Sequence, residues 1–400
     1  MSIVSKRIAL VTAVFPPFHS SGAVQLADLS KEFVTQGYQL TVFVPSSDIN
    51  DSYLLENKHD INILRLRAPK SRDMPYVRRT ISEFFTPYFM MWNLRNCPLN
   101  NNEWDGVVWY SPSIFLTPLV KFLKNKNNCR TYLIVRDIFP EWVVNLGLMK
   151  RGLAYWFFKL VEYSQYKVAN TVGVQSDGNL KYFHQISVKF SCAIEVLQNW
   201  LGEKELRGCS IDIASTSLSG RKILVYAGNM GVAQDLEIFI DLASKYNQRP
   251  EIGFLFVGRG SERIHLEKKS KALGLSNILF FNEINSSEIP GLYKQCHAGI
   301  ISLDRRHLTH NIPGKFLTYM AAGLPVFALV NHGNDLLSLI RKNDVGVVSS
   351  EYSTHKLDPL LSKFIDDLSV KDYSIKCKLL ASKIFSPEIA VKQIVHALFG

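Results

Sequence analysis

The sequence predicts an α/β protein made of two Rossmann-like, doubly wound domains that face one another across a cleft. Short apolar runs alternate with amphipathic helical segments along the chain, and this order produces a parallel sheet with helices on both of its faces. With 400 residues, 47% of them hydrophobic and 20% charged, the chain is long and apolar enough for two such domains. A polar, Ser/Gly-rich segment at 201–220 separates two sets of strands and is predicted to be the linker.

Residues 1–200 are predicted to form the first domain. An opening strand at 7–15 is followed by an amphipathic helix at 22–37, which ends in a glycine, a common residue at helix C-termini. The apolar run stops at Pro16–Pro17 without a small-residue cleavage site, which favours a strand over a signal peptide. Further strands are predicted at 38–45, 61–66, 106–111, 130–137 and 170–175.

Residues 221–384 are predicted to form the second domain. It begins with a strand at 222–228 and a helix at 235–246. Further strands are predicted at 252–258, 277–283, 298–303 and 325–330. A last helix within 385–400 is a candidate to cross back to the first domain. Doubly wound domains bind ligands at the carboxyl ends of their strands, so the cleft is predicted to hold the site.

An almost uncharged stretch at 311–330 decides how the second domain is interpreted. Its length would suit a membrane span, but a Gly-Leu-Pro sequence ending at Pro325 breaks it in the middle. We therefore predict a helix at 315–322, a tight turn and a buried strand at 326–330. The helix start exposes unpaired N–H groups, and Lys315 adds a positive charge, which together predict a phosphate site.

Two glycine turns support a phosphate site in the same domain. Gly228 and Gly231 follow one predicted strand, and Gly258 follows the next, with Arg259 between it and a further glycine. Glycine lets the backbone approach a bound group closely, although a single such turn is more often only a strand–helix joint. Together with the turn at Lys315, there are three such turns at the strand ends of one domain.

The first domain has two candidate site segments. A turn at 15–23 leads into a helix at Gly22. The cluster at 136–142 places Arg136, Asp137 and Glu141 directly after an apolar strand. A solvated loop is the alternative interpretation of these charges. Because the strand before them is wholly apolar, we expect the cluster at the edge of the cleft.

Missing motifs exclude several classes of enzyme. The chain has no D-x-D triplet, no H-E-x-x-H, no G-x-x-x-x-G-K-[ST] and no G-x-S-x-G. This argues against a carboxylate metal site, a zinc protease, a P-loop and a serine hydrolase. The six cysteines are scattered without a C-x-x-C pair, so we expect reduced structural thiols and no zinc site.

The net charge of +11 leans towards the first half of the chain. Nucleic acid, an anionic membrane or phosphorylated ligands could each explain it, as could a basic surface without a partner. Arginines and aromatic residues are mixed at 72–95, and the stretch 150–167 is similar, which suits a membrane interface. A buried helix is the alternative, and Pro87 is expected to interrupt any long helix in the first stretch.

Six motifs resemble those of one known family. They are FPPFHSSGAVQLADLSKEFVTQGYQLTVFVP, VRDIFPEWVVNLGLM, VLQNW, VYAGNMGVAQDLE, FVGRGSER and IPGKFLTYMAAGLPV. In order and spacing they resemble the retaining family-4 glycosyltransferases of the GT-B fold. Together they are similar to the subgroup that adds N-acetylhexosamine-type sugars, including fucosamine, to bacterial O-antigen or capsule repeat units.

The resemblance implies a division of roles between the domains. The second would bind a nucleotide-diphosphate sugar, UDP-linked in our prediction, without a metal or other cofactor. Its donor-binding residues would be Gly228, Asn229, Gly231, Gly258, Arg259, Glu283, Ile284, Asn311, Pro313, Gly314, Lys315 and Thr318. The first would carry the catalytic candidates Arg136, Asp137 and Glu141, and Ser21 and Gly22 for the acceptor.

The implied acceptor is a lipid-diphosphate-linked sugar or an oligosaccharide. The implied location is cytoplasmic, with peripheral contact to the anionic inner face of the cytoplasmic membrane and no nucleic-acid partner. Retention in the family is thought to need no protein nucleophile, so none is assigned.

The chain departs from the family pattern at several site positions. Ser21–Gly22 stands where a Gly-Gly pair is usual, and 110–115 lacks the histidine that many members carry. Thr318 stands where a glutamate commonly binds the donor ribose. The basic residues that often grip the diphosphate near the first glycine turn are missing, so Lys315 or Arg259 would have to substitute.

Three alternatives remain open on the sequence. A sugar-nucleotide 2-epimerase shares the fold and the nucleotide site but needs no acceptor. A nicotinamide-dependent oxidoreductase is less favoured, because the G-x-G at 258–260 ends in Arg263 instead of a third glycine. A basic nucleic-acid-binding module has no recognised motif here.

Overall fold

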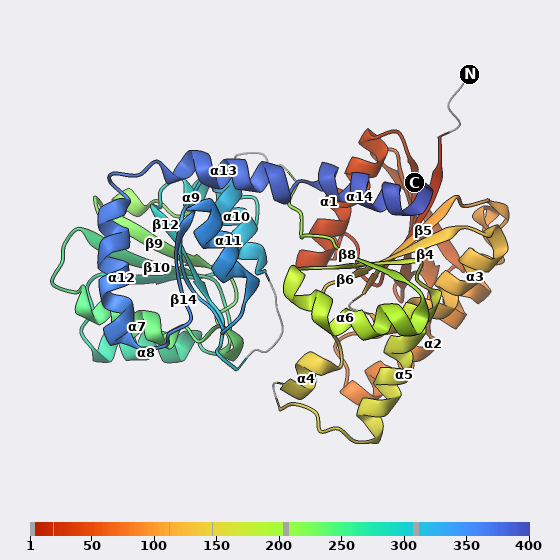
Figure 1. Cartoon of the computed structure of the whole chain (residues 1–400), viewed down its shortest axis with the longest axis horizontal. Helices are drawn as coiled ribbons and strands as arrows, with labels where there is room; N and C mark the ends of the chain where they lie inside the picture. The colour runs from red at the N-terminus through yellow and green to blue at the C-terminus, as the bar shows by residue number, and fades with distance from the viewer. Residues whose placement is uncertain (1–4, 19, 112, 146, 203–207, 307–311) are drawn as a thin grey trace. The chain divides into compact units, whose positions relative to one another are not determined.

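A computed structural model describes residues 5–400 except 19, 112, 146, 203–207 and 307–311 (Figure 1). The chain divides into two compact units, which are described separately. Unit 1 comprises residues 1–202 and 387–400, and unit 2 comprises residues 203–386. The predicted class is confirmed, because each unit is built on a largely parallel sheet with helices between its strands.

Unit 1 contains, in its described part, an eight-stranded sheet in the order β3-β4-β2-β1-β5-β6-β7-β8. Every neighbouring pair is parallel except β3 and β4. The strands are β1 Arg7–Val11, β2 Gln39–Ser46, β3 Tyr53–Lys58, β4 Ile61–Arg67, β5 Gly106–Ser111, β6 Arg130–Val135, β7 Thr171–Val174 and β8 Ala193–Val196. From β1 the chain first adds β2, β4 and β3 on one side, and it then returns to place β5 on the other side of β1. The switch point of the sheet therefore lies between β1 and β5.

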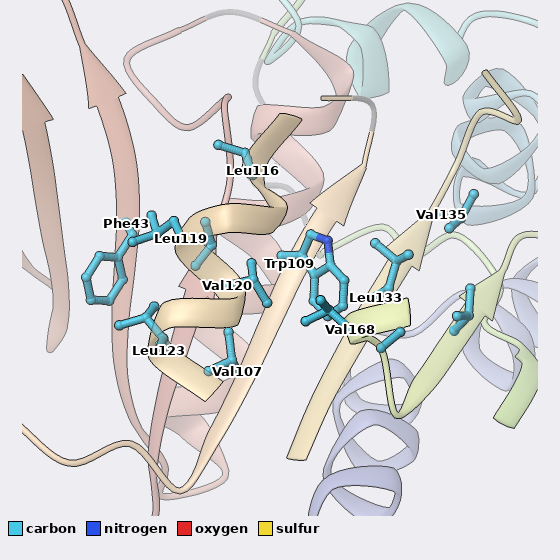
Figure 2. Packing of buried hydrophobic residues seen from close by; sticks show 14 of the residues in the cluster. Phe43, Val107, Trp109, Leu116, Leu119, Val120, Leu123, Leu133, Val135 and Val168 are labelled. Atoms are coloured by element: carbon cyan, nitrogen blue, oxygen red, sulfur yellow. The ribbon is translucent and has the colours of Figure 1, made fainter. Parts of the chain in front are cut away.

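The helices of unit 1 bury apolar side chains on both faces of this sheet. They are α1 Ser21–Thr35, α2 Tyr76–Leu94, α3 Thr117–Asn127, α4 Glu141–Asn145, α5 Leu153–Val168, α6 Asp177–Phe190 and α14 Pro387–Phe399, with short turns η1 Pro98–Asn101 and η2 Ile114–Leu116. Alternate residues of a strand point to opposite faces. Trp109 and Leu133 thus lie in one core with α3 (Figure 2), whereas Val108 and Ile134 lie in the other with α1 and α14.

Unit 2 contains, among the described residues, a six-stranded parallel sheet in the order β11-β10-β9-β12-β13-β14. The strands are β9 Lys222–Ala227, β10 Ile252–Val257, β11 Ile278–Phe281, β12 Ala298–Ser302, β13 Val326–Leu329 and β14 Gly346–Ser349. The helices are α7 Glu237–Lys245, α8 Arg263–Ala272, α9 Ile289–Tyr293, α10 Gly314–Ala322, α11 Asp335–Asn343, α12 Thr354–Asp367 and α13 Tyr373–Ile384, with short turns η3 Ile213–Ser215 and η4 Val232–Gln234. The switch point lies between β9 and β12.

The uncharged stretch at 311–330 has the predicted helix, turn and strand where it is described. Helix α10 ends at Ala322, and its C-cap Gly323 has a left-handed φ of +77° that favours glycine. Strand β13 follows with all four residues buried. Within the described residues, no helix is both long and apolar enough to cross a membrane.

The structure differs from the sequence predictions at one helix and at three edge strands, and the opening strand ends at Val11 instead of residue 15. Helix α2 runs for 19 residues through Pro87, where we expected an interruption. Pro87 lacks the N–H that would bond the carbonyl of Glu83, and the burial of Thr86, Pro87 and Met90 on one side of the helix holds it together across this missing bond. Strands β3, β8 and β14 were not predicted. Strand β3 is an exposed edge strand that lacks an apolar pattern, and β8 and β14 are edge strands of only four residues.

The segment between the two predicted domains is partly folded into unit 2. Ile211, Ile213 and Leu218 are buried, and the side-chain amide of Gln295 bonds to the backbone on both sides of the segment's turn. The last helix, α14, packs in unit 1 against α1, and Gln393 donates to the carbonyl at the end of β8 at 2.8 Å.

Candidate functional site

The two glycine turns of unit 2 pack against each other at the ends of neighbouring strands. Gly228 follows β9 and Gly258 follows β10. Their φ values are +140° and +146°, which residues with a side chain rarely adopt. A Cβ atom on Gly258 would lie 2.0 Å from the carbonyl oxygen of Gly228. The amide of Met230 also donates to the carbonyl of Arg259 at 2.7 Å. Only glycine allows this approach, so the turns form one backbone surface at the carboxyl edge of the sheet.

Lys315 extends from the start of α10 to this surface. Its Nζ lies 4.7 Å from the centre of the Tyr226 ring, and a Cβ atom on Gly228 would meet its Cε at 2.7 Å. Burial lowers the pKa of Lys315 to about 8. The ammonium group therefore loses hydration, and its attraction to the face of the Tyr226 ring compensates only part of the lost hydration free energy. A bound anion would restore the stability of the charged form.

Helix α10 holds Lys315 in place through packing on the switch point. The Tyr319 hydroxyl donates to the carbonyl of Val225 in β9 at 2.9 Å and lies 3.3 Å from that of Ile300 in β12. The hydroxyl of Thr318 donates back to the carbonyl of Lys315 at 2.9 Å. Pro313, at the N-cap, provides no side-chain bond to the free N–H groups of the helix. The N–H groups of the first helical turn point outwards along the helix axis at its N-terminus, and this arrangement suits an anion.

The other donor candidates occupy different positions around this site. Arg259 pairs with Glu283 at 3.1 Å, and both side chains are largely exposed. Such a pair contributes little to stability, so Arg259 could exchange its partner readily. Asn229 is exposed and Ile284, after β11, is partly buried. The backbone of Gly231 donates to Gln234, Gly314 is exposed at the start of α10, and Asn311 lies outside the described residues.

The acceptor candidates in unit 1 lie beside its switch point. Ser21 and Gly22 begin α1, after the N-cap Ser20. A Cβ atom on Gly22 would lie 3.1 Å from the hydroxyl oxygen of Tyr110, near the end of β5. Burial raises the pKa of Tyr110 to about 12, and the nearby Arg136 opposes this rise. The structure thus brings the two predicted segments of unit 1 together around a tyrosine.

Arg136 and Asp137, which are adjacent in sequence, have different surroundings. The guanidinium of Arg136 is buried, donates to the carbonyl of Leu197 at 2.8 Å and lies 4.6 Å from the Trp200 ring centre. Burial lowers its pKa to about 10. Asp137 is exposed by surface area, yet the surrounding protein raises the pKa of its carboxyl group, while Arg136 opposes this rise. Arg136 is therefore placed to hold the backbone, whereas Asp137 is accessible.

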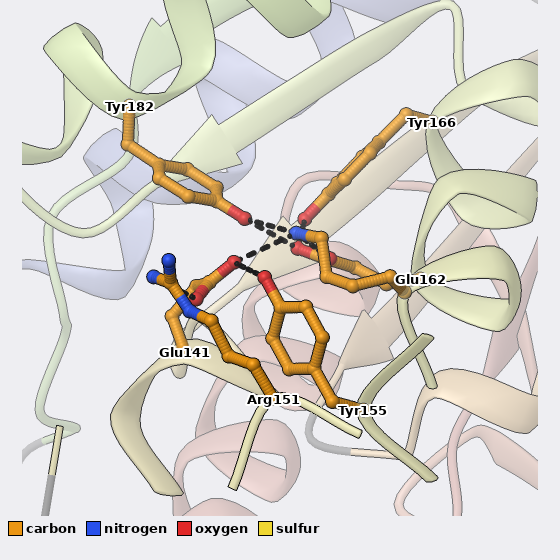
Figure 3. A network of polar contacts seen from close by, with 7 residues as sticks. Glu141, Arg151, Tyr155, Glu162, Tyr166 and Tyr182 are labelled. Atoms are coloured by element: carbon orange, nitrogen blue, oxygen red, sulfur yellow. Dashed lines mark hydrogen bonds and ion pairs between the residues drawn. The ribbon is translucent and has the colours of Figure 1, made fainter. Parts of the chain in front are cut away.

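Glu141 lies in a polar network that connects three helices (Figure 3). Its carboxylate accepts the hydroxyl of Tyr155 at 3.0 Å and pairs with Lys159 at 3.0 Å. Lys159, almost fully buried, also pairs with Glu162 at 2.5 Å. Burial lowers the pKa of Lys159, but the charges of both glutamates raise it and prevail. These contacts give Glu141 a structural function in fixing α4 on α5.

Tyr110 and Tyr226 are candidate site residues that the sequence analysis missed. Each is the fifth residue of a six-residue strand beside a switch point, and each lies next to a predicted site residue. A tyrosine near the carboxyl end of an otherwise apolar strand was the available signal. In the part of the chain that the structure describes, no group of three or more His, Cys, Asp or Glu side chains is arranged to hold a metal ion.

Comparisons with known proteins identify the class to which this fold belongs. Residues 211–375 match the family model described as glycosyl transferases group 1, and this segment includes both glycine turns and α10. Over its whole length the chain resembles a sucrose-phosphate synthase from Thermosynechococcus elongatus, with a TM-score of 0.72, 15% identity and 98% of both chains covered. It also resembles WaaG, a glycosyltransferase involved in lipopolysaccharide biosynthesis, with a TM-score of 0.63, 14% identity and coverage of 98% of this chain and 100% of that one. The chain has the GT-B glycosyltransferase fold.

Two curated relatives share sequence with part of the chain. The first is a protein of Escherichia coli K12 named as a colanic acid biosynthesis glycosyl transferase, WcaI, which is 25% identical over 227 residues. The second is a protein of Pseudomonas aeruginosa named as a glycosyltransferase, WbjE, which is 22% identical over 248 residues. The matches cover 55% and 60% of this chain and 56% and 60% of the two relatives.

Proposed function

We propose that this protein is a retaining glycosyltransferase of bacterial surface polysaccharide biosynthesis. It transfers an N-acetylhexosamine-type sugar from a UDP-linked donor to a lipid-diphosphate-linked or oligosaccharide acceptor. The observation that carries the proposal is the position of Lys315 beside the Gly228 turn, inside the segment that matches group 1 glycosyl transferases. The two curated relatives bear glycosyltransferase names, which favours transfer over the epimerase alternative.

The donor half of the site suits the departure of a nucleoside diphosphate. Breaking the sugar–phosphate bond leaves negative charge on the diphosphate, and positive groups that await this charge stabilise the transition state. Lys315, the backbone of the glycine turns and the free N–H groups of α10 supply such an environment without a metal ion. We therefore propose that transfer is metal-independent and persists in excess chelator.

A UDP-linked donor is supported by a structural neighbour. HepE of Anabaena has been solved in complex with UDP, and it resembles this chain with a TM-score of 0.68, 14% identity and 98% of both chains covered. At this identity the likeness concerns the fold, so the nucleotide of the present protein is part of the proposal.

The acceptor half of the proposal rests on Asp137. It is exposed two residues after the end of β6, and its neighbours in sequence, Arg136 and Glu141, make structural contacts. We assign Asp137 to accepting the proton of the acceptor hydroxyl or to orienting that hydroxyl, with Ser21 and Gly22 lining the acceptor side. Arg136 and Glu141 act as positioning residues for the segment that carries it. No protein nucleophile is assigned.

A donor screen tests the proposed function most directly. Purified protein is incubated with individual sugar nucleotides and a lipid-diphosphate sugar acceptor, and the products are analysed by mass spectrometry. Transfer from one UDP-sugar, unaffected by excess chelator, is the expected result. Conversion of a sugar nucleotide without any acceptor would establish the epimerase alternative. Activity that manganese restores after chelation would contradict metal independence.

We further propose that the enzyme works on the cytoplasmic, anionic face of the membrane, with α2 in contact. This helix carries exposed Arg78 and Arg79 among exposed aromatic residues. Vesicles with anionic lipid are expected to retain the protein at low salt. Charge reversal with Arg78→Glu and Arg79→Glu should release it. The same change at Lys268 and Lys271, which are exposed on α8 in unit 2, is the matched control. Equal release by both pairs would exclude α2 as the contact.

A further inference from the structure

Exposed apolar side chains are concentrated on one part of unit 1. Among the described residues, 27 large apolar side chains are exposed, and thirteen of them lie on α2, α3 and α5. Helix α3 packs against both α2 and α5 (Figure 1). Soluble proteins rarely expose a large contiguous apolar area, and such areas usually mark a contact with a partner or a membrane.

A groove of about 840 Å³ lies between these three helices. Aromatic side chains line one end, where the ring centre of Phe84 is 6.3 Å from that of Phe115 and 6.1 Å from that of Phe157. Leu160 and Val161 continue the apolar lining along α5. The volume is that of a binding site for a small organic molecule or a hydrocarbon chain.

The other end of the groove is positively charged. Lys121, Lys124 and Lys167 line it, and its described lining includes no acidic residue. Lys124 donates to the carbonyl of Val168 at 2.9 Å, which shows that the C-terminal parts of α3 and α5 meet there. Lys121 and Lys167 are exposed. The groove is thus apolar along its length and cationic at one end.

We propose that this groove binds one acyl chain of an anionic phospholipid, whose phosphate contacts the lysines at the cationic end. The inference rests on the proposed function, in which the enzyme works at an anionic membrane. An anionic lipid matches the groove in both respects, because the chain gains about 0.8 kcal/mol for each methylene buried and the headgroup meets the lysines. A second copy of this chain fits less well, since a two-fold interface would bring the same lysines together.

The groove is connected to the segment that carries the acceptor candidate. Phe115, at its aromatic end, contacts Phe158 with 6.3 Å between ring centres, and Phe158 contacts Phe139 at 4.9 Å. Phe139 lies two residues after Asp137. A lipid held in the groove would therefore orient unit 1 at the membrane with its acceptor segment near the lipid surface.

The test uses vesicles of phosphatidylcholine and phosphatidylglycerol, in which a fraction of the phosphatidylglycerol carries a photoreactive acyl chain. After illumination the modified peptides are mapped by mass spectrometry. Adducts are expected on groove-lining residues of α3 and α5, such as Val161. The same chain on phosphatidylcholine should label these residues less, and Lys121→Glu with Lys167→Glu should abolish the difference between the two lipids.

The Ser164→Trp variant separates binding in the groove from adsorption to the surface. Ser164 lines the groove, and tryptophan there would fill it while adding apolar surface. Labelling of α3 and α5 should fall by about tenfold, which corresponds to losing the burial of roughly two methylenes. Gln185→Trp, on the exposed part of α6, adds the same surface elsewhere and should leave labelling unchanged.

Three results would overturn the inference. They are adducts confined to the exposed residues of α2, labelling that Ser164→Trp does not reduce, and cross-links between two protein molecules at this face. Calorimetric titration of UDP into the same variants separates this inference from the proposed function. A groove variant that binds UDP normally but is no longer labelled would show that the change affects the groove alone. A wild-type protein that is labelled but does not bind UDP would contradict the proposed donor site and leave the lipid site supported.

Discussion

Tyr110 in unit 1 and Tyr226 in unit 2 lie near the ends of strands beside the two switch points, and each is close to a basic residue. In unit 1 that residue is Arg136, which is buried and donates to backbone carbonyls. In unit 2 it is Lys315, whose ammonium group lies over the ring of Tyr226 and beside a glycine turn. The same sheet plan thus supports two uses of a cation, one holding the fold and the other available to a ligand.

The surroundings of the two units explain this difference. Unit 1 fills the space after β6 with side chains, whose charges pair with one another in the network around Glu141 and Lys159. In unit 2 the space after β9 and β10 is lined by backbone, because a glycine residue follows each of these strands. A diphosphate needs many donors at short range, which backbone N–H groups and a lysine can supply. An acceptor hydroxyl needs one accessible carboxylate, which Asp137 can supply.

The largest expected effect concerns the backbone surface of unit 2. Gly258→Ala should lower the free energy of unfolding of unit 2 by about 3–5 kcal/mol, because the new Cβ would lie 2.0 Å from a carbonyl oxygen in a left-handed backbone. Denaturant unfolding measures this change. The control is Gly274→Ala, where φ is +61° but no atom lies within 4 Å, so a loss of only about 1 kcal/mol is expected. Equal losses of unfolding free energy in the two variants would show that Gly258 is required for its backbone conformation and not for the contact between the turns.

The fold was more accessible from the sequence than the site was. The order of apolar runs predicted the inner strands of both sheets, because a strand buried on both faces must be apolar throughout, as in β5 and β10, but it missed the edge strands β3, β8 and β14. Roles of charged residues depend on partners that are distant in sequence. Glu141 and Lys159 are 18 positions apart, and no local pattern indicates that their charges meet. For the same reason the burial of Arg136 could not be separated from the exposure of Asp137 before the structure was available.

Removing the carboxylate of Asp137 gives the second prediction. Asp137→Asn should lower turnover by about a hundredfold or more, because a positioned proton acceptor contributes roughly 10²–10⁴-fold. The affinity for UDP should stay unchanged, since the proposed function assigns the residue to the acceptor side. Steady-state kinetics and calorimetric titration provide the two measurements. Wild-type turnover in this variant would remove Asp137 from the site.

A comparison within unit 1 sharpens this prediction. Glu141→Gln should reduce stability, because Lys159 would remain buried with one charged partner fewer. Its turnover, measured where the variant is fully folded, should fall less than that of Asp137→Asn. The reverse order would assign the proton acceptor to Glu141 instead.

Removing the ammonium group of Lys315 gives the third prediction. Lys315→Ala should weaken UDP binding by about ten- to a hundredfold, since a charged hydrogen bond in a partly closed site contributes about 1.5–3 kcal/mol. Stability without ligand should change little or rise slightly, because a cation at a helix N-terminus is unfavourable. Arg259→Ala should have the smaller effect. If the two variants bind in the opposite order, Arg259 holds the diphosphate and Lys315 does not contact it.

The smallest expected effect is the dependence of UDP affinity on pH, and it tests the environment of Lys315 most specifically. Burial lowers the pKa of this residue from 10.5 to about 8, and a bound diphosphate should raise it again. Between pH 7 and pH 9 the free protein changes from mostly charged to mostly neutral at Lys315, so the affinity for UDP should fall by about tenfold. The free energy of unfolding without ligand should rise over the pH range in which the affinity for UDP falls. Between about pH 8 and 10.5 Lys315 is mostly neutral in the folded protein but still protonated in the unfolded chain, so raising the pH favours the folded state. Lys315→Arg keeps its charge throughout this range and should bind UDP without this pH dependence. A wild-type affinity that stays constant from pH 7 to 9 would mean that Lys315 does not contact the diphosphate or is not desolvated in solution, and the result for Lys315→Ala would then distinguish between the two.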